Sequence, residues 1–295
     1  MNSLSTLTVL CYHRVLPDLR TPLARLYSLR GLAVSVETFA RQMASARANC
    51  NVISLDDAID AVENNRHLPP RSLLVTFDDG YRDFLDFAVP VLSAFGIPSV
   101  QFARVPEADG LPSWAPLDWL RMVLVQARAT SALAAEYLTG EARESLVRAT
   151  YEDQIREVAR IADTLGVDAV AADRAVVYAR DSELTALAPH NVAIGSHGTQ
   201  HERWTLLSEC AVESVLTTSK AWLDAKRARH VLAWPDGAVN AQVTTIARRL
   251  GFHVGFALHD VPGAVSGPLA VPRVLVPDEP ECINSLVTIA SKESA

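Results

Sequence analysis

The chain has 295 residues, of which 49% are hydrophobic and 21% charged, and these proportions exclude a disordered chain. Its net charge is −7 at pH 7 and Lys and Arg form no dense cluster, so we expect no nucleic-acid partner.

The apolar pattern alternates between strands and helices. In the first hundred residues we expect strands at 7–11, 52–53, 73–77 and 98–102, and helices at 36–48, 55–63 and 84–95. Ser35 and Ser54 are placed to cap the first two of these helices. Strands that alternate with helices predict a mainly parallel sheet, whose active-site residues follow the C-terminal ends of strands.

The pattern changes from about residue 118 to residue 165. This segment is rich in Ala, Leu, Glu and Arg, and its apolar spacing predicts two or three inserted helices. Further along we expect strands at 176–178, 192–195, 231–234, 254–257 and 274–276, and helices at 182–188 and 208–225. The chain is therefore expected to be a single domain over residues 1–295, with a helical insertion at about 118–165.

Cysteine spacing and the N-terminal sequence bear on the compartment. The four cysteines form no Cys-x-x-Cys pair, which argues against a structural zinc site or a redox motif. The N-terminus lacks the basic start and long apolar run of a signal peptide, and no stretch reaches the roughly 18 apolar residues of a membrane span. We therefore expect a cytoplasmic protein with no transmembrane segment.

The first chemical signal is Thr76-Phe77-Asp78-Asp79-Gly80, at the end of a buried apolar strand. Two adjacent carboxylates at the edge of a core are costly unless something compensates their charge, and a metal ion is the usual compensation. The alternative is an ordinary turn, because Asp and Gly are common turn residues.

The second signal is the pair His197 and His201, which again follows an expected strand. Two histidines four residues apart can direct both rings to one point, although a pair of surface histidines is the alternative. One Asp and two His would leave an open coordination position, as in a catalytic metal site. Such ligands suit Zn²⁺, with Co²⁺, Ni²⁺, Fe²⁺ or Mn²⁺ as other occupants. The second aspartate is then available as a general base.

These residues resemble the motifs of the polysaccharide deacetylase family, also called the NodB-homology or carbohydrate esterase 4 group. The resemblance covers most of residues 7–104 and 176–277, and it leaves the helical segment outside. Five motifs occur in the family's order: Tyr12-His13-Arg14-Val15, Thr76-Phe77-Asp78-Asp79-Gly80, His197-Gly198-Thr199-Gln200-His201, Ala233-Trp234-Pro235-Asp236-Gly237 and Val271-Pro272-Arg273-Val274. Two positions depart from the pattern, since Gly198 replaces the usual Ser or Thr and Ala233 replaces the usual Arg.

The resemblance implies an α/β fold, namely a distorted (β/α)7-type barrel with a helical insert. It also implies a role for each motif residue. Asp78 would be the catalytic base, and Asp79, His197 and His201 would bind the metal. The backbone N–H of Asp236 would stabilise the oxyanion that forms in the reaction. The insert could cap the barrel, line a substrate groove or form a dimer surface.

Other residues are expected in supporting roles. The family's late general-acid histidine, in a Leu-x-x-His pattern, is missing here, so His13 and His259 are candidates, each with a structural histidine as the alternative. Arg273 would replace the missing Arg of the third motif, or else be a structural ion-pair partner. Trp234 would form a groove wall, or else pack in the core.

The activity implied is metal-dependent removal of N-acetyl groups from an amino-sugar-containing saccharide or glycan precursor. Family members with the Tyr-His-x-Val opening act in exopolysaccharide or cell-envelope pathways. One alternative is an O-acetyl esterase or another amide hydrolase of the same fold. The other is a non-catalytic saccharide-binding relative, which the missing late histidine and Gly198 would favour.

Overall fold

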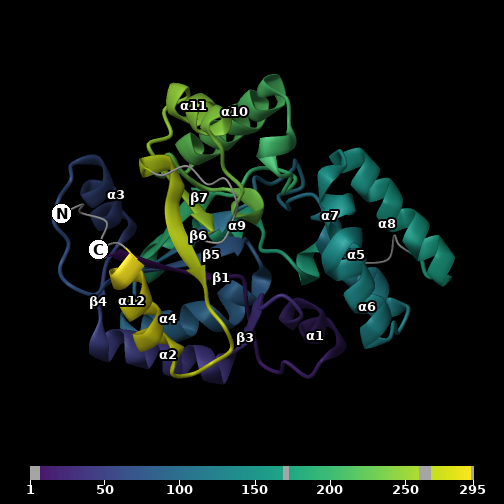
Figure 1. Cartoon of the computed structure of the whole chain (residues 1–295), viewed down its shortest axis with the longest axis horizontal. Coiled ribbons are helices and arrows are strands. Elements are labelled where there is room, and N and C mark those ends of the chain that lie inside the picture. The colour runs from purple at the N-terminus through teal and green to yellow at the C-terminus, as the bar shows by residue number, and fades with distance from the viewer. Residues whose placement is uncertain (1–6, 169–172, 259–266, 294–295) are drawn as a thin grey trace.

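Seven parallel strands form the centre of the computed structural model, which describes residues 7–168, 173–258 and 267–293 (Figure 1). Neighbouring strands follow the order β1, β10, β9, β8, β7, β6 and β5, and β5 pairs with β1, so the sheet closes into a barrel. The expected distorted (β/α)7-type barrel is therefore confirmed. The strands are β1 (Leu7–Tyr12), β5 (Ser72–Asp79), β6 (Ser99–Ala103), β7 (Val192–Ser196), β8 (Val231–Ala233), β9 (Val254–Leu258) and β10 (Val271–Leu275).

Strand β5 shows why these segments form a barrel. Its residues are buried along its whole length, as expected of a parallel strand covered on both faces. Because side chains alternate along a strand, Leu74 packs with Phe102 and Phe256 in one cluster, whereas Leu73 and Val75 pack in another. A short strand β4 (Asn51–Val52) adds to the start of β5. Strands β2 (Arg14–Leu16) and β3 (Ala33–Ser35) form a separate small sheet, which the sequence did not predict.

Helices surround the barrel, with α10 and α11 on one side and α2, α4 and α12 on the other (Figure 1). Ser35 and Ser54 cap α2 and α3 as expected, since each hydroxyl accepts a hydrogen bond from a backbone N–H three residues later. Among the described residues, none of the helices has the length and apolarity of a membrane span. The helices outside the insert are α1 (Pro22–Ser28), α2 (Val36–Asn49), α3 (Leu55–Glu63), α4 (Val89–Phe95), α9 (Asp181–Thr185), α10 (Glu209–Ala225), α11 (Ala241–Arg249) and α12 (Cys282–Glu293).

One local prediction was wrong. The strand expected at 176–178 is a 3-10 turn at Arg174–Val176, because the N–H of Arg82 bonds the Val177 carbonyl and ties this segment to the loop after β5. The helix expected at 84–95 is confirmed, with a π-helical first turn at Phe84–Ala88 that passes into α4.

The segment at 118–165 is helical and packs around its own apolar residues beside the barrel (Figure 1). Its helices are α5 (Pro116–Gln126), α6 (Ser131–Leu138), α7 (Gly140–Arg148) and α8 (Tyr151–Leu165). We call these four helices the insert. Asp118 of α5 joins the insert to the barrel side, because it accepts hydrogen bonds from the hydroxyls of Tyr27, Tyr81 and Tyr178.

Candidate metal centre and active site

The two aspartates lie at the C-terminal end of β5, and both are buried. Asp78 is 3% exposed and Asp79 is 5% exposed, so each charge needs a compensating partner. The chain turns sharply here, with φ of +72° at Asp79 and +74° at Gly80. A Cβ atom at Gly80 would lie 3.1 Å from the Cβ of Ala103 on the neighbouring strand, so both the angle and the space favour glycine. This turn gives the two neighbouring carboxylates different surroundings.

Asp79, His197 and His201 converge as the sequence predicted, and their ligand atoms lie within 4.8 Å of one another. The Oδ1 atom of Asp79 is 3.8 Å from Nε2 of His197 and 3.5 Å from Nε2 of His201. That oxygen is buried and has no hydrogen-bond partner among the described residues. A buried acceptor facing two imidazole nitrogens fits a divalent cation, since all three groups can donate electron pairs to one ion.

The protonation states also suit a metal. The Nδ1 atom of His197 lies 2.8 Å from the carbonyl oxygen of Ala233 and donates to it, which leaves the Nε2 lone pair free. Burial lowers the pKa of His197 to about 4, so the ring is neutral at pH 7. Burial raises the pKa of Asp79, but the nearby His201 and His197 outweigh it and the net shift is downward. The triad therefore offers a neutral imidazole at His197 and an ionised carboxylate at Asp79.

Asp78 is held by Arg273 from β10. Two hydrogen bonds of 2.7 Å join the guanidinium to both carboxylate oxygens, and Arg273 also donates to the hydroxyl of Thr76 at 3.2 Å. Burial raises the pKa of Asp78, but the charge of Arg273 outweighs it, with help from His197, and holds the pKa well below its usual range. Asp78 is therefore ionised at neutral pH, the state in which a general base accepts a proton.

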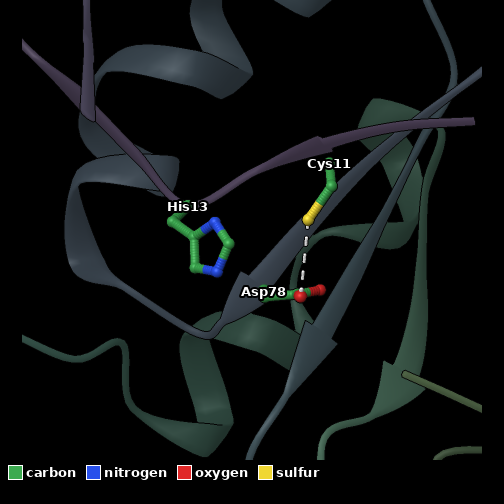
Figure 2. Close-up of side chains that lie close together, drawn as sticks. All are labelled: Cys11, His13 and Asp78. Carbon is green, nitrogen blue, oxygen red and sulfur yellow. Dashed lines mark hydrogen bonds between the residues drawn. The ribbon is translucent and has the colours of Figure 1, made fainter. Parts of the chain in front are cut away.

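A second group of possible ligand residues is Cys11, His13 and Asp78 (Figure 2). It adjoins the triad, since Oδ2 of Asp78 lies 4.0 Å from Nε2 of His197. The Cys11 thiol donates to Oδ2 of Asp78 at 3.6 Å. Burial raises the pKa of that thiol well above its usual range, so it is neutral. Since Arg273 already bonds both oxygens of Asp78, this group is a poor second metal site. Sequence reasoning missed Cys11, although its place two residues before His13 puts it on the same face of the chain.

The structure brings one of the two general-acid candidates to the site. His13 faces Asp78 in Figure 2, and its buried Nδ1 has no hydrogen-bond partner among the described residues. Burial lowers the pKa of His13, so its protonated form gives up a proton readily. His259, the other candidate, lies outside the described residues.

Asp236 lies in the 3-10 turn Pro235–Gly237 that follows β8, with a left-handed φ of +54°. Its carboxylate accepts hydrogen bonds from Arg143 of the insert and from Arg203. Burial raises the pKa of Asp236, but Arg143, His201 and Arg203 outweigh it and lower the pKa below its usual range. Sequence reasoning missed Arg143 and Arg203, because neither belongs to a motif.

Trp234 belongs to the core. Its side chain is fully buried and its Nε1 donates to the carbonyl oxygen of Leu269 at 2.8 Å. The groove-wall role considered for it is therefore wrong, since none of its surface is open to a ligand.

The chain is similar in sequence to known polysaccharide deacetylases. A family model described as polysaccharide deacetylase matches residues 140–255. Two relatives named poly-beta-1,6-N-acetyl-D-glucosamine N-deacetylase, from Escherichia coli strains K12 and O157:H7, are each 24% identical over 272 residues. Each match covers 89% of this chain and 37% of the relative, so the chain spans little more than a third of the length of these curated relatives.

Solved structures support the fold. A deacetylase named PplD from Streptococcus pyogenes, in complex with acetate, has a TM-score of 0.63 at 15% identity, covering 95% of this chain and 97% of its own. IcaB from Ammonifex degensii has a TM-score of 0.58 at 21% identity, covering 97% of each chain. At these identities the similarity shows the fold alone.

Proposed function

Because the chain belongs to the polysaccharide deacetylase family, we propose that it is a metal-dependent hydrolase that removes N-acetyl groups from an amino-sugar-containing saccharide. One observation carries the proposal. The buried Oδ1 atom of Asp79, which has no hydrogen-bond partner among the described residues, faces two imidazoles beside the ionised carboxylate of Asp78. A ligand set with an adjacent base is the arrangement that metal-assisted hydrolysis of an amide requires.

The proposed metal is Zn²⁺, held by Asp79, His197 and His201. A bound ion of this kind polarises the acetamide carbonyl and lowers the pKa of a water. Two imidazoles and one carboxylate suit Zn²⁺, and the same three ligands can also bind Co²⁺, Ni²⁺, Fe²⁺ or Mn²⁺.

The chain's own residues move the protons in this proposal. Asp78 takes a proton from the attacking water at its carboxylate, which Arg273 keeps ionised and oriented. The N–H of Asp236 stabilises the negative charge that develops on the carbonyl oxygen. The proton that Asp78 has taken then passes through the His13 imidazole to the leaving amine nitrogen, so the C–N bond breaks and acetate and a free amine result.

The proposed substrate is an oligomer or polymer that contains N-acetylglucosamine, and the named activity of the Escherichia coli relatives supports it. The intact triad and base argue against a non-catalytic saccharide-binding relative. The cytoplasmic location expected from the sequence stays a prediction.

The test is acetate release from β-1,6- and β-1,4-linked N-acetylglucosamine oligomers, an N-acetylated sugar nucleotide and acetylated xylan. Metal-stripped protein is compared with protein given Zn²⁺, Co²⁺ or Ni²⁺, beside Asp78→Asn. Asp163→Asn, at an exposed position on α8, is the matched control. We expect metal-dependent release from an amino sugar that Asp78→Asn abolishes and Asp163→Asn leaves unchanged. Release from xylan alone would make the protein an esterase, and no release from any substrate would contradict the proposal.

A further inference from the structure

Four charged side chains join the insert to the active site in a closed set of ion pairs. Arg143 bonds the carboxylates of Asp236 and Glu144, and Arg203 bonds the same two carboxylates. We call Arg143, Glu144, Arg203 and Asp236 the insert ring. The nitrogen–oxygen distances from Arg143 are 2.6 Å to Glu144 and 2.7 Å to Asp236. Those from Arg203 are 3.1 Å to Glu144 and 3.0 Å to Asp236. Two cations and two anions make the ring neutral overall.

The insert ring differs from an ordinary surface ion pair. The side chain of Arg143 is only 5% exposed and that of Asp236 only 17% exposed, so the pair lies mostly out of water. Removing one member of such a pair leaves the other charge buried without its partner, which is far more costly than losing an exposed pair. Glu144, at 43% exposed, is the open side of the ring.

Each ring member comes from a segment that matters to the proposed reaction. Arg203 follows the metal ligand His201 by two residues, and Asp236 supplies the N–H proposed for the oxyanion. Arg143 and Glu144 come from α7, which lies outside every motif of the active site. The ring therefore connects the insert to the metal-ligand loop and to the turn after β8.

The Asp236 turn needs this support. A left-handed φ at a residue other than glycine is strained, and it persists when the surroundings fix it. The hydrogen bonds that close the turn are donated by the N–H groups of Gly237 and Ala238, so neither uses that of Asp236. An uncompensated carboxylate beside that N–H would oppose the negative charge of the oxyanion, and the two arginines remove this repulsion.

We propose that Arg143 is a positioning residue, which acts through Asp236 to hold and neutralise the oxyanion turn, so that the insert is a working part of the active site. This inference rests on the proposed function. Arg143 donates hydrogen bonds to Glu144 and Asp236, so it acts on the reaction through the orientation and local charge of the Asp236 N–H.

The test compares Arg143→Met with Arg148→Met, because Arg148 lies at the exposed end of the same helix. We expect Arg143→Met to lower kcat about tenfold or more with little change in KM, as a misplaced group in the transition state does. Arg148→Met should match the wild type, and Arg143→Lys should recover part of kcat. Equal kcat for Arg143→Met and the wild type would overturn the proposal.

A double-mutant cycle with Asp236→Asn separates positioning from general damage. If Arg143 acts through the Asp236 carboxylate, Arg143→Met should cost little further kcat in the Asp236→Asn background. An equal loss in both backgrounds would mean that Arg143 acts independently of Asp236, and would overturn the proposal.

A second measurement does not depend on activity. In protein labelled with ¹⁵N-aspartate, the Asp236 amide signal is identified by its loss in Asp236→Asn. We expect Arg143→Met to shift this signal and Arg148→Met to leave it in place. If the wild type releases no acetate, the proposed function fails, and the amide signal alone then decides the physical link. An unmoved signal in Arg143→Met would overturn that link.

Discussion

Asp78 and Asp79 are neighbours in the chain, yet their surroundings suit them for different tasks. Both oxygens of Asp78 accept hydrogen bonds from Arg273, whereas Oδ1 of Asp79 accepts none and faces the rings of His197 and His201. A carboxylate that accepts hydrogen bonds from an arginine stays ionised and can take a proton, while a carboxylate oxygen that accepts no hydrogen bond can bind a cation. The left-handed turn at Asp79 produces this difference.

Changing Arg273 tests the assignment of Asp78 as the base. Arg273→Met removes the charge that lowers the pKa of Asp78, so that pKa rises. Since a general base works above its pKa, we expect the acid limb of kcat/KM to move to higher pH and the maximum to fall about a hundredfold. A pH profile of acetate release measures both effects, with Arg47→Met at an exposed position as the control. An unmoved acid limb would contradict the assignment.

His197 makes the stability of the metal-free protein depend on pH. Its folded pKa of about 4 lies below the ordinary 6.5, so between these values the unfolded chain binds more protons and stability falls as pH falls. The contribution is on the order of 3 kcal/mol across this window. Urea unfolding at pH 7 and pH 4.5 should show a smaller difference for His197→Gln than for the wild type. The exposed His253→Gln is the control, and equal differences for both variants would contradict the burial argument.

At the scale of elements, the loop from His197 to His201 departs from the family's pattern for a steric reason. Gly198 has a φ of +78°, and a Cβ atom there would lie 2.6 Å from the ring of Trp204. Trp204 is fully buried and packs edge-on against Trp234, so it cannot move aside cheaply. The packing of Trp204 against this loop thus explains the glycine, and both metal ligands, His197 and His201, stay in place.

Restoring the family's usual residue should therefore harm this chain. We expect Gly198→Ser to lower the free energy of unfolding by about 1–3 kcal/mol more than Gly166→Ser does. Gly166 also has a positive φ, of +67°, but open space around its Cβ position, so the comparison isolates the clash with Trp204. Urea unfolding of the two variants is the measurement. Equal losses of unfolding free energy in the two variants would contradict the clash with Trp204, because both positions have a positive φ.

The sequence predicted most of the barrel and the metal ligands for a physical reason. Chemistry-bearing residues that directly follow apolar strands, such as Asp79 and His197, are placed by the strand itself. Arg143 and Arg203 were missed because their contacts depend on tertiary packing, which no local pattern records. The strand expected at 176–178 was wrong for the same reason, because the backbone there forms hydrogen bonds with the loop after β5 and not with the sheet.

At the scale of the whole molecule, a buried polar cluster joins the insert to the barrel. Asp118 of α5 is 2% exposed, and it accepts hydrogen bonds from three tyrosine hydroxyls and from Arg121. One of the three, Tyr81, follows the Asp78-Asp79-Gly80 turn directly. The cluster therefore anchors α5, the first helix of the insert, next to the active site.

Asp118→Asn tests this anchor. The change keeps the shape of the side chain but replaces one acceptor oxygen with an NH2 group, which cannot accept a hydrogen bond from the tyrosine hydroxyls. We therefore expect a loss of about 3 kcal/mol in the free energy of unfolding. Asp163→Asn on α8 is the control, because Asp163 is exposed. A loss below about 1 kcal/mol, the range of an exposed pair, would contradict the role of Asp118 as an anchor.

The metal that Asp79, His197 and His201 are proposed to hold is the central requirement of the proposed reaction. The most direct measurement is to strip the protein of metal, add Zn²⁺ in steps, and follow bound metal and acetate release together. We expect activity to rise in proportion to bound metal and to level off at one ion per chain, with Asp79→Asn losing both binding and activity. Full activity in the stripped protein, or undiminished metal binding by Asp79→Asn, would contradict the account.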